Sequence, residues 1–169
     1  MKIIPCTHEH LHDLQHISQI TFKDTFADHN NEQDMLDYIE TAFNLEKLGR
    51  ELQEAASAFY IAYKNTEMVG YVKVNEAPAQ TEINDATSLE LERIYLRKDT
   101  RGRGEGQQLM DFVVNTAKDK QKEYLWLGVW ENNQPALKFY QKHGFYAFSE
   151  HDFWVGNDRQ RDILMRLDL

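Results

Sequence analysis

The sequence predicts an α/β protein in which a mixed β-sheet is flanked by helices. One observation is the order of periodic segments, which runs strand, helices, three strands, helix, strand, helix and two strands. A second is a glycine-rich turn at residues 102–106, where a strand runs directly into a helix. The third is size and composition, because 169 residues with 41% hydrophobic and 28% charged side chains suit one globular domain. We therefore expect a single domain over residues 1–169.

Composition restricts the partners and the location. The formal net charge of −9 argues against a nucleic-acid-binding surface and permits a cationic substrate. Cys6 is the one cysteine, so an intramolecular disulfide is impossible and a reducing compartment is expected. No signal peptide or long apolar run is evident, so we expect a cytoplasmic protein without a membrane partner. His8, His12 and His16 share helical spacing, but no cysteine or carboxylate cluster completes a site, and no metal is expected.

The first 54 residues are predicted to form a short strand and three helices. Residues 2–6 form the strand, Thr7 caps the first helix, and Asn31 and Asn44 begin the second and third. Apolar side chains recur at helical spacing in the three helices: Leu11, Leu14, Ile17, Ile20, Met35, Leu36, Ile39, Ala42, Phe43, Leu45, Leu48 and Leu52. Residues 24–54 also hold nine acidic and two basic side chains. Most of these carboxylates are expected to be solvated, while a few could flank the entrance for a polycation.

The remaining residues are predicted to alternate between strands and helices. The predicted strands cover residues 58–63, 68–74, 89–96, 124–130, 145–154 and 159–167. A turn at residues 64–67 joins the first two, and Gly156-Asn157 joins the last two. One helix begins at Gly104, and another covers residues 133–143, with Asn133 as its cap and Pro135 in its first turn.

The strand at residues 89–96 changes its alternation halfway. Leu89 and Leu91 share one parity, whereas Ile94 and Leu96 have the other. If all four side chains face one core, one extra residue must be inserted near Glu92-Arg93, as in a β-bulge. The alternative is a strand buried on both faces with no bulge.

The turn at residues 102–106 leaves backbone N–H groups unpaired at the positive end of a helix, where a phosphate can accept them. A P-loop is excluded because no Lys-Ser or Lys-Thr pair follows the glycines. A dinucleotide-binding turn would need a third glycine where Leu109 stands, and a parallel βαβ unit at the start of the domain. Another kind of phosphate ligand is therefore expected.

Two motifs resemble the GNAT superfamily of N-acetyltransferases. The first is Arg101-x-x-Gly104-x-Gly106 after the predicted fourth strand, and the second is Asn133-x-x-Ala136-x-x-x-Tyr140-x-x-x-Gly144-Phe145. The resemblance implies a mixed sheet of about seven strands flanked by helices, with a bulge in strand 4 and a splay between strands 4 and 5. It implies acetyl-coenzyme A (acetyl-CoA) as the co-substrate.

Almost the whole chain resembles the PaiA-type spermidine/spermine acetyltransferases of bacteria. Four stretches carry this likeness: Thr21-Phe22-Lys23-Asp24-Thr25-Phe26, Gly70-Tyr71-Val72-Lys73-Val74-Asn75, Leu91-Glu92-Arg93-Ile94-Tyr95 and Trp126-Leu127-Gly128-Val129-Trp130-Glu131. The resemblance implies that a primary amine of a polyamine attacks the thioester directly in a ternary complex. One alternative is a different acceptor amine, on a protein N-terminus or lysine, an amino sugar or an antibiotic. The other is a non-catalytic CoA-binding regulatory module.

The resemblance also implies roles for particular residues. The cofactor-binding set comprises Ile94, Tyr95 and Leu96 for the pantetheine arm, Arg101, Gly102, Arg103, Gly104, Glu105, Gly106 and Gln107 for the pyrophosphate, and Asn133, Ala136 and Tyr140 on the later helix. The N–H of Ile94 would stabilise the oxyanion, and Tyr140 would protonate the leaving thiolate. Glu105 stands where the superfamily usually has Ile or Leu, and its side chain is expected to point to solvent.

The acceptor amine must lose a proton before it attacks, because an alkylammonium has a pKa of about 10.4. Glu92 is the candidate base and Glu90 the second, with direct loss to water as the alternative. Asp24, Asp28 and Asp37 are candidates for binding the distal ammonium of a polyamine. Homodimers are common in this superfamily, so a homodimer is possible here.

Overall fold

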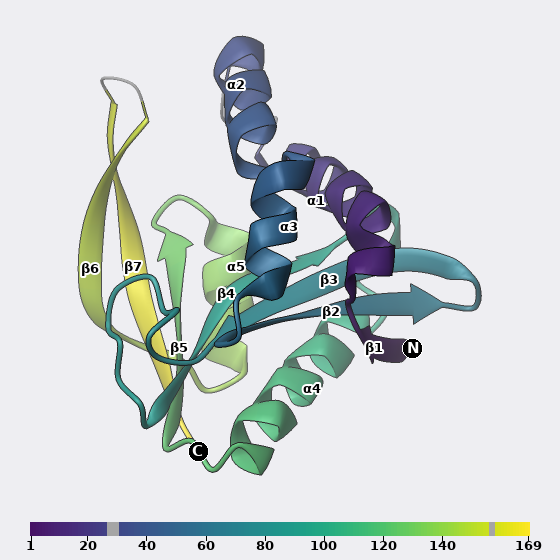
Figure 1. The fold of residues 1–169 in the computed structure, drawn as a ribbon. Coiled ribbons are helices and arrows are strands. Elements are labelled where there is room, and N and C mark those ends of the chain that lie inside the picture. The colour runs from purple at the N-terminus through teal and green to yellow at the C-terminus, as the bar shows by residue number, and fades with distance from the viewer. Residues whose placement is uncertain (27–30, 156–157) are drawn as a thin grey trace.

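The computed structural model describes residues 1–26, 31–155 and 158–169 (Figure 1). The strands are β1 (Lys2–Pro5), β2 (Ser57–Lys64), β3 (Glu67–Asn75), β4 (Ser88–Leu96), β5 (Tyr124–Trp130), β6 (Tyr146–Val155) and β7 (Asp158–Asp168). The helices are α1 (Leu11–Phe26), α2 (Glu32–Ala42), α3 (Leu45–Gln53), α4 (Glu105–Asp119) and α5 (Gln134–Lys142), with short 3-10 turns at His8–His10 and Lys98–Thr100. In the described part of the chain, no helix is long and apolar enough to cross a membrane.

The strands form one mixed sheet in the order β1-β2-β3-β4-β5-β7-β6. β4 and β5 are parallel, and the other neighbouring pairs are antiparallel. The predicted fold class and its seven-stranded sheet are therefore confirmed. The turn predicted at Gly156-Asn157 lies outside the described residues.

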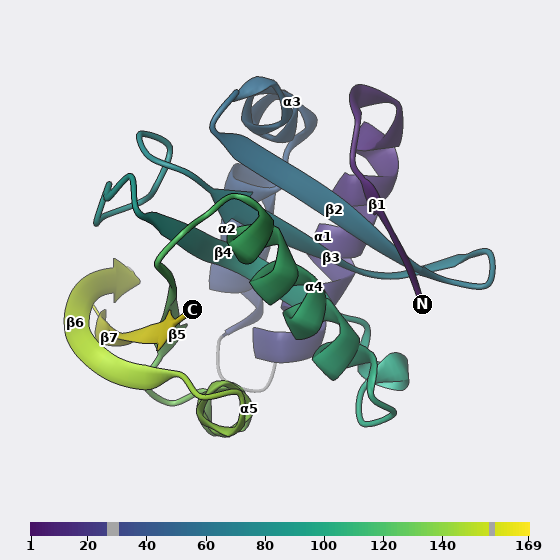
Figure 2. The same ribbon diagram turned by 90° about the horizontal axis from the view of Figure 1, so that it is seen from below.

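Helices cover both faces of the sheet, which separates the two main hydrophobic cores (Figure 2). On one face, α1, α2 and α3 pack against the sheet around Leu14, Ile39, Leu48, Phe59 and Tyr71. On the other face, α4 and α5 contribute side chains that include Leu109, Met110, Val113 and Tyr140. Adjacent residues of β3 serve different cores, because successive side chains of a strand point to opposite faces.

Asparagine side chains begin three of the helices, as the sequence predicts. Oδ1 of Asn31, of Asn44 and of Asn133 accepts a hydrogen bond from the backbone N–H three residues later. Thr7 begins a 3-10 turn instead, in which the ring of His10 accepts the N–H of Thr7 at 3.0 Å, and α1 follows from Leu11.

The predicted bulge in β4 is confirmed at Glu92. β3 pairs Lys73 with Arg93 but the next residue, Val74, with Leu91, so Glu92 is the extra residue. Its insertion brings Leu89, Leu91, Ile94 and Leu96 to the same core. A similar shift at Val69 in β3, beside β2, has no signal in the alternation of the sequence.

β4 and β5 separate soon after they begin. Their pairing covers only Ser88 with Tyr124, Leu89 with Leu125 and Glu90 with Trp126. Beyond Glu90 and Trp126 both strands continue, but they no longer pair with each other. This is the splay that the resemblance implies. The bulge at Glu92 lies just where the strands separate.

Candidate active site

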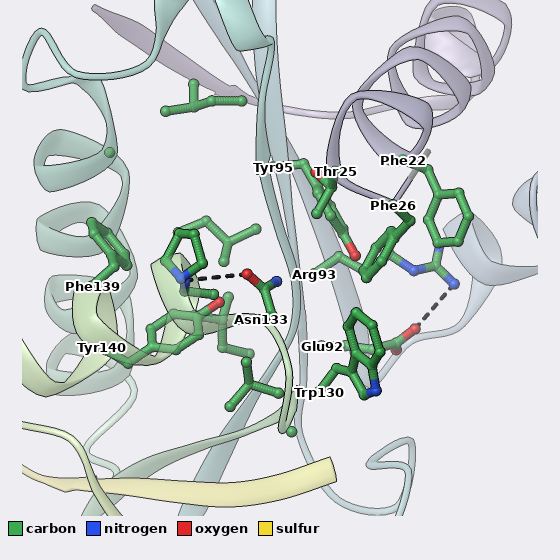
Figure 3. A pocket seen from close by; sticks show the side chains of 18 of the residues that line it. Phe22, Thr25, Phe26, Glu92, Arg93, Tyr95, Trp130, Asn133, Phe139 and Tyr140 are labelled. Atoms are coloured by element: carbon green, nitrogen blue, oxygen red, sulfur yellow. Dashed lines mark hydrogen bonds and ion pairs between the residues drawn. The ribbon is translucent and has the colours of Figure 1, made fainter. Parts of the chain in front are cut away.

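A cavity of about 1130 Å³ opens at the splay between β4 and β5. Its lining comes from both sides of the sheet. Figure 3 shows Tyr140, Phe139 and Asn133 on the α5 side, with Phe22, Phe26, Trp130 and the Arg93–Glu92 ion pair on the other. Two ligands can therefore enter from opposite faces and meet in the gap between the strands.

The edge of β4 supplies backbone groups to this cavity. Ile94, Tyr95 and Leu96 pair with β3 on one side, and on the β5 side none of the described strands pairs with them. All three line the cavity. Such an edge can accept an extended ligand as an additional strand. The pantetheine arm of acetyl-CoA has amide groups suited to this pairing.

The three glycines of the turn after β4 have two different structural roles. Gly102 and Gly104 have φ of +82° and +95°, a conformation that other residues adopt only with strain. A Cβ at either position would meet nothing within 4 Å, so the backbone there stays open to a ligand. Gly106 instead allows close packing, since its Cβ would lie 3.3 Å from Cε2 of Phe139. These three glycines and Gln107 line the cavity.

Arg101 fixes the start of the turn. Its Nε donates to the carbonyl of Leu96 at 2.9 Å, and its Nη2 donates to Oγ1 of Thr25 in α1 at 3.0 Å. Arg101 lines the cavity, whereas Arg103 does not. The guanidinium of Arg101 thus joins the end of β4 to α1 and presents positive charge beside the glycines.

The expectation that Glu105 points to solvent is wrong. Its side chain is only 5% exposed and forms an ion pair of 2.5 Å with Nζ of Lys64 in β2. The hydrogen bond from Lys64, together with the N–H of Glu105 itself, lowers the pKa of this carboxyl. Glu105 does not line the cavity, and Lys64 neutralises its charge beside the glycine turn.

This ion pair leads to a prediction for acetyl-CoA affinity. Replacing Lys64 with Met leaves the Glu105 carboxylate uncompensated beside the turn, and we expect the Kd of acetyl-CoA to rise about threefold to tenfold through charge repulsion. The double variant with Glu105→Gln should restore the affinity. Isothermal titration calorimetry of both variants checks this, and an unchanged Kd in Lys64→Met would show that Glu105 does not influence the ligand.

α5 presents polar groups along the cavity. Oδ1 of Asn133 caps the helix by accepting the N–H of Ala136 at 3.3 Å, which leaves the Nδ2 amide for a ligand. The ring of Tyr140 packs between Phe139 and Phe145, with centroid distances of 5.5 and 5.8 Å. Burial raises the pKa of Tyr140, so the phenol keeps its proton at neutral pH and can donate it.

Aromatic rings form a wall on the opposite side of the cavity. The ring of Phe22 stacks on Tyr38 with centroids 4.6 Å apart and contacts Phe26 at the same distance. Phe26 in turn lies 6.4 Å from Trp130 at the end of β5. Aromatic faces attract cations and also bind alkyl chains, so this wall, which we call the aromatic wall, suits an alkylammonium.

Glu92 lies in this half of the cavity within a network of buried charges. Its carboxylate contacts Nζ of Lys73 at 2.6 Å, Nη2 of Arg93 at 3.0 Å and Nδ2 of Asn75 at 2.6 Å. Glu51 of α3 pairs with the same two cations at 3.2 and 3.0 Å. Burial alone would raise the pKa of Glu92, but Arg93 and Lys73 lower it overall.

The other predicted acidic residues lie in different places. Glu90 is buried away from the cavity, where it accepts hydrogen bonds from Thr81 and Asn75, and burial raises its pKa. Asp24 also lies off the cavity and accepts the N–H of Lys98 at 3.0 Å. Asp37 lines the cavity beside the aromatic wall. Asp28 lies outside the described residues.

Several cavity residues have no signal in the motifs of the sequence. Asp34 and Tyr38 reach the cavity from α2, His143 from the end of α5, and Asp162 from β7. Asp34 and Tyr38 belong to the acidic second helix, but nothing in its periodicity distinguishes them from their neighbours. Asp162 can be found only once the pairing of β7 with β5 is known.

Comparison with known proteins assigns the family. The model of the acetyltransferase (GNAT) family matches residues 11–145. An uncharacterized N-acetyltransferase of Lactobacillus delbrueckii subsp. lactis is 42% identical over 166 residues, which cover 98% of this chain and 96% of that protein. A spermine/spermidine N(1)-acetyltransferase of Bacillus subtilis is 26% identical over 92 residues, or 54% of this chain and 60% of that one.

The fold is similar to that of a solved structure with a ligand. The PaiA N-acetyltransferase of Thermoplasma acidophilum, in complex with coenzyme A, superposes with a TM-score of 0.78 at 21% identity over 100% of both chains. The open glycine turn, the unpaired edge of β4 and the cavity beside them fit acetyl-CoA, the co-substrate of these acyltransferases. The chain belongs to the GNAT family of acetyltransferases.

Proposed function

We propose that this N-acetyltransferase moves the acetyl group of acetyl-CoA to a primary amine of a small polycation of the spermidine/spermine class. The observation that carries the proposal is the acceptor half of the cavity, where the aromatic wall stands beside the carboxylates of Asp34, Asp37 and Asp162. Arg93, which also lines this half, is neutralised by Glu51 and Glu92. A chain of methylene groups with several ammonium charges matches such a surface.

The donor would lie along β4 and α5. When bound, acetyl-CoA supplies an activated acetyl thioester. The turn from Arg101 to Gln107 holds the pyrophosphate with backbone N–H groups, and the free edge of Ile94–Leu96 pairs with the pantetheine arm. The N–H of Ile94 would stabilise negative charge on the thioester oxygen, and Nδ2 of Asn133 would hydrogen-bond the pantetheine or acetyl end.

Tyr140 is the proposed general acid. A thiol has a pKa of about 8.5 and a phenol one of about 10, so a phenol is protonated when the thiolate leaves and can transfer its proton. Burial raises the pKa of Tyr140 further, so the phenol stays protonated across the neutral pH range. Asp37 is the proposed site for the distal ammonium, since it lines the cavity from α2.

An acceptor panel tests the proposed substrate class. Initial rates of thiol release are measured with spermidine, spermine, putrescine, n-butylamine, glucosamine and an alanine-initiated peptide at fixed acetyl-CoA. We expect kcat/KM for spermidine and spermine to exceed that for n-butylamine at least about tenfold, because the distal ammonium of a polyamine binds a carboxylate of the cavity. A peptide or amino sugar with the highest kcat/KM would contradict the proposed class.

A pair of variants locates the distal charge in the same assay. Asp37→Asn should raise KM for spermidine about threefold to tenfold and leave KM for n-butylamine unchanged. Glu40→Gln on the same helix is the matched control, because Glu40 does not line the cavity at the splay. Equal effects of the two substitutions would remove Asp37 from the acceptor site.

A further inference from the structure

Asp162 stands on the acceptor face of the sheet at the edge of the splay. It lies in β7, where the register places it opposite Trp130 of β5, and Leu164 opposite Gly128. Directly paired residues of antiparallel strands share a face, so Asp162 lies on the face of Trp130, whose ring contacts Phe26 of the aromatic wall. Asp162 lines the cavity together with Gly128 and Trp130.

The carboxylate of Asp162 is open to the cavity. A Cβ on Gly128 would lie 3.5 Å from Oδ2 of Asp162, so the missing side chain leaves space in front of this oxygen. Among the side chains that the structure describes, which are those of residues 1–26, 31–152 and 159–169, none forms a hydrogen bond or ion pair with the Asp162 carboxylate. Glu92 differs, because Lys73, Arg93 and Asn75 already contact its oxygens.

The environment also raises the pKa of Asp162 toward neutrality while leaving it mostly ionised at pH 7. Burial raises the pKa of Asp162 to about 6, with His151 of β6 lowering it and Glu82 of the β3–β4 loop raising it. Tyr38 of α2 also lines the cavity and interacts electrostatically with Asp162 and with Arg93 and Glu92 of β4. A base in this range accepts protons effectively at physiological pH, whereas the lowered pKa of Glu92 makes that carboxylate a poor acceptor.

We propose that Asp162 is the catalytic base that removes a proton from the acceptor ammonium. This inference rests on the proposed function only in requiring a cationic primary amine. The ammonium gives one proton to Asp162, and the neutral nitrogen then forms the N–C bond as the C–S bond breaks. The thiolate receives a proton from Tyr140, the nitrogen releases its second proton to restore Tyr140, and Asp162 returns its own proton to solvent.

The test is the pH dependence of kcat/KM in wild type and Asp162→Asn between about pH 5.5 and pH 9. Wild type should rise through an apparent pKa near 6 and then stay level, because the base is ionised while the amine is still charged. The variant should be about 100-fold slower at pH 7 and should gain about tenfold per pH unit, because it depends on free amine from solution. The two curves therefore converge at high pH.

A constant ratio between the two curves at all pH values above 7 would overturn the proposal, because it would mean that Asp162 only binds the cation. Gly128→Val is the second variant, because the valine side chain covers Oδ2 of Asp162 without removing its charge. Like Asp162→Asn, it should lose the pH range in which kcat/KM is constant. Folding is checked by thermal unfolding at pH 8, where Asp162→Asn should not be less stable than wild type, because it removes a half-buried charge.

The experiment separates this proposal from the proposed substrate class. The amine with the highest kcat/KM in the acceptor panel is used, whichever class it belongs to. If spermidine is not acetylated but another primary amine is, the substrate proposal fails while the pH profiles still decide the role of Asp162. An identical pH profile in wild type and Asp162→Asn would leave the substrate proposal intact and remove Asp162 from catalysis.

Discussion

Tyr140→Phe should lower kcat about 10²- to 10⁴-fold and leave the Kd of acetyl-CoA within about twofold. The substitution removes one hydroxyl and keeps the ring that packs against Phe139 and Phe145. Without the phenolic proton, the thiolate must leave as an anion or take its proton from water. Steady-state thiol release with the preferred amine measures kcat, and calorimetry measures the affinity for acetyl-CoA.

Tyr146→Phe is the matched control for this prediction. Tyr146 is 47% exposed, and its hydroxyl donates to Asp168 far from the cavity lining, so its loss should leave kcat unchanged. Wild-type turnover in Tyr140→Phe would exclude the phenol as the proton donor. A loss of acetyl-CoA binding equal to the loss of kcat would instead assign Tyr140 to ligand binding.

Glu92→Gln should lower the free energy of unfolding by about 3–5 kcal/mol. Glu92 and Glu51 together neutralise Lys73 and Arg93, and all four side chains are at most 17% exposed. Removing one carboxylate leaves two buried cations with a single partner. Urea unfolding at about pH 7, followed by circular dichroism, measures the loss.

The pH dependence of this loss has a defined sign. The pKa of Glu92 is lowered in the folded state, so its contribution is present above the unfolded value of about 4.3 and disappears as pH falls through the folded value. The difference between wild type and variant should therefore shrink below about pH 4. Glu46→Gln, which breaks the exposed Glu46–Arg50 pair, should cost less than about 1 kcal/mol. Equal losses in the two variants would contradict a buried network at Glu92.

Local features of the fold could be predicted from the sequence. The change of alternation between Leu91 and Ile94 predicts a bulge near Glu92-Arg93, because the four apolar side chains reach one core only if a residue is inserted there, and the register with β3 locates it at Glu92. Asn31, Asn44 and Asn133 marked helix starts through their capping side chains. The splay followed only from the resemblance, because the point at which two parallel strands stop pairing leaves no local pattern.

The acceptor half of the cavity could not be predicted to the same extent. The aromatic wall joins α1, α2 and β5, and Asp162 reaches it from β7, so its members are distant in the sequence. The buried position of Glu105 cannot be predicted locally because its partner, Lys64, lies 41 residues earlier, and the ion pair joins the end of β2 to the start of α4. Glu90 and Asp24 have the expected charge, but hydrogen bonds to Thr81 and Lys98 hold them away from the cavity.

The most direct measurement is the product balance of one reaction with acetyl-CoA and spermidine. Mass spectrometry identifies the acylated amine, and a thiol reagent measures free coenzyme A over the same interval. Transfer to a polyamine predicts that monoacetylated spermidine and free thiol appear in equal amounts, at a rate that rises with spermidine concentration. Acetyl-CoA binding without amine acetylation, or thiol release that spermidine does not change, would contradict it.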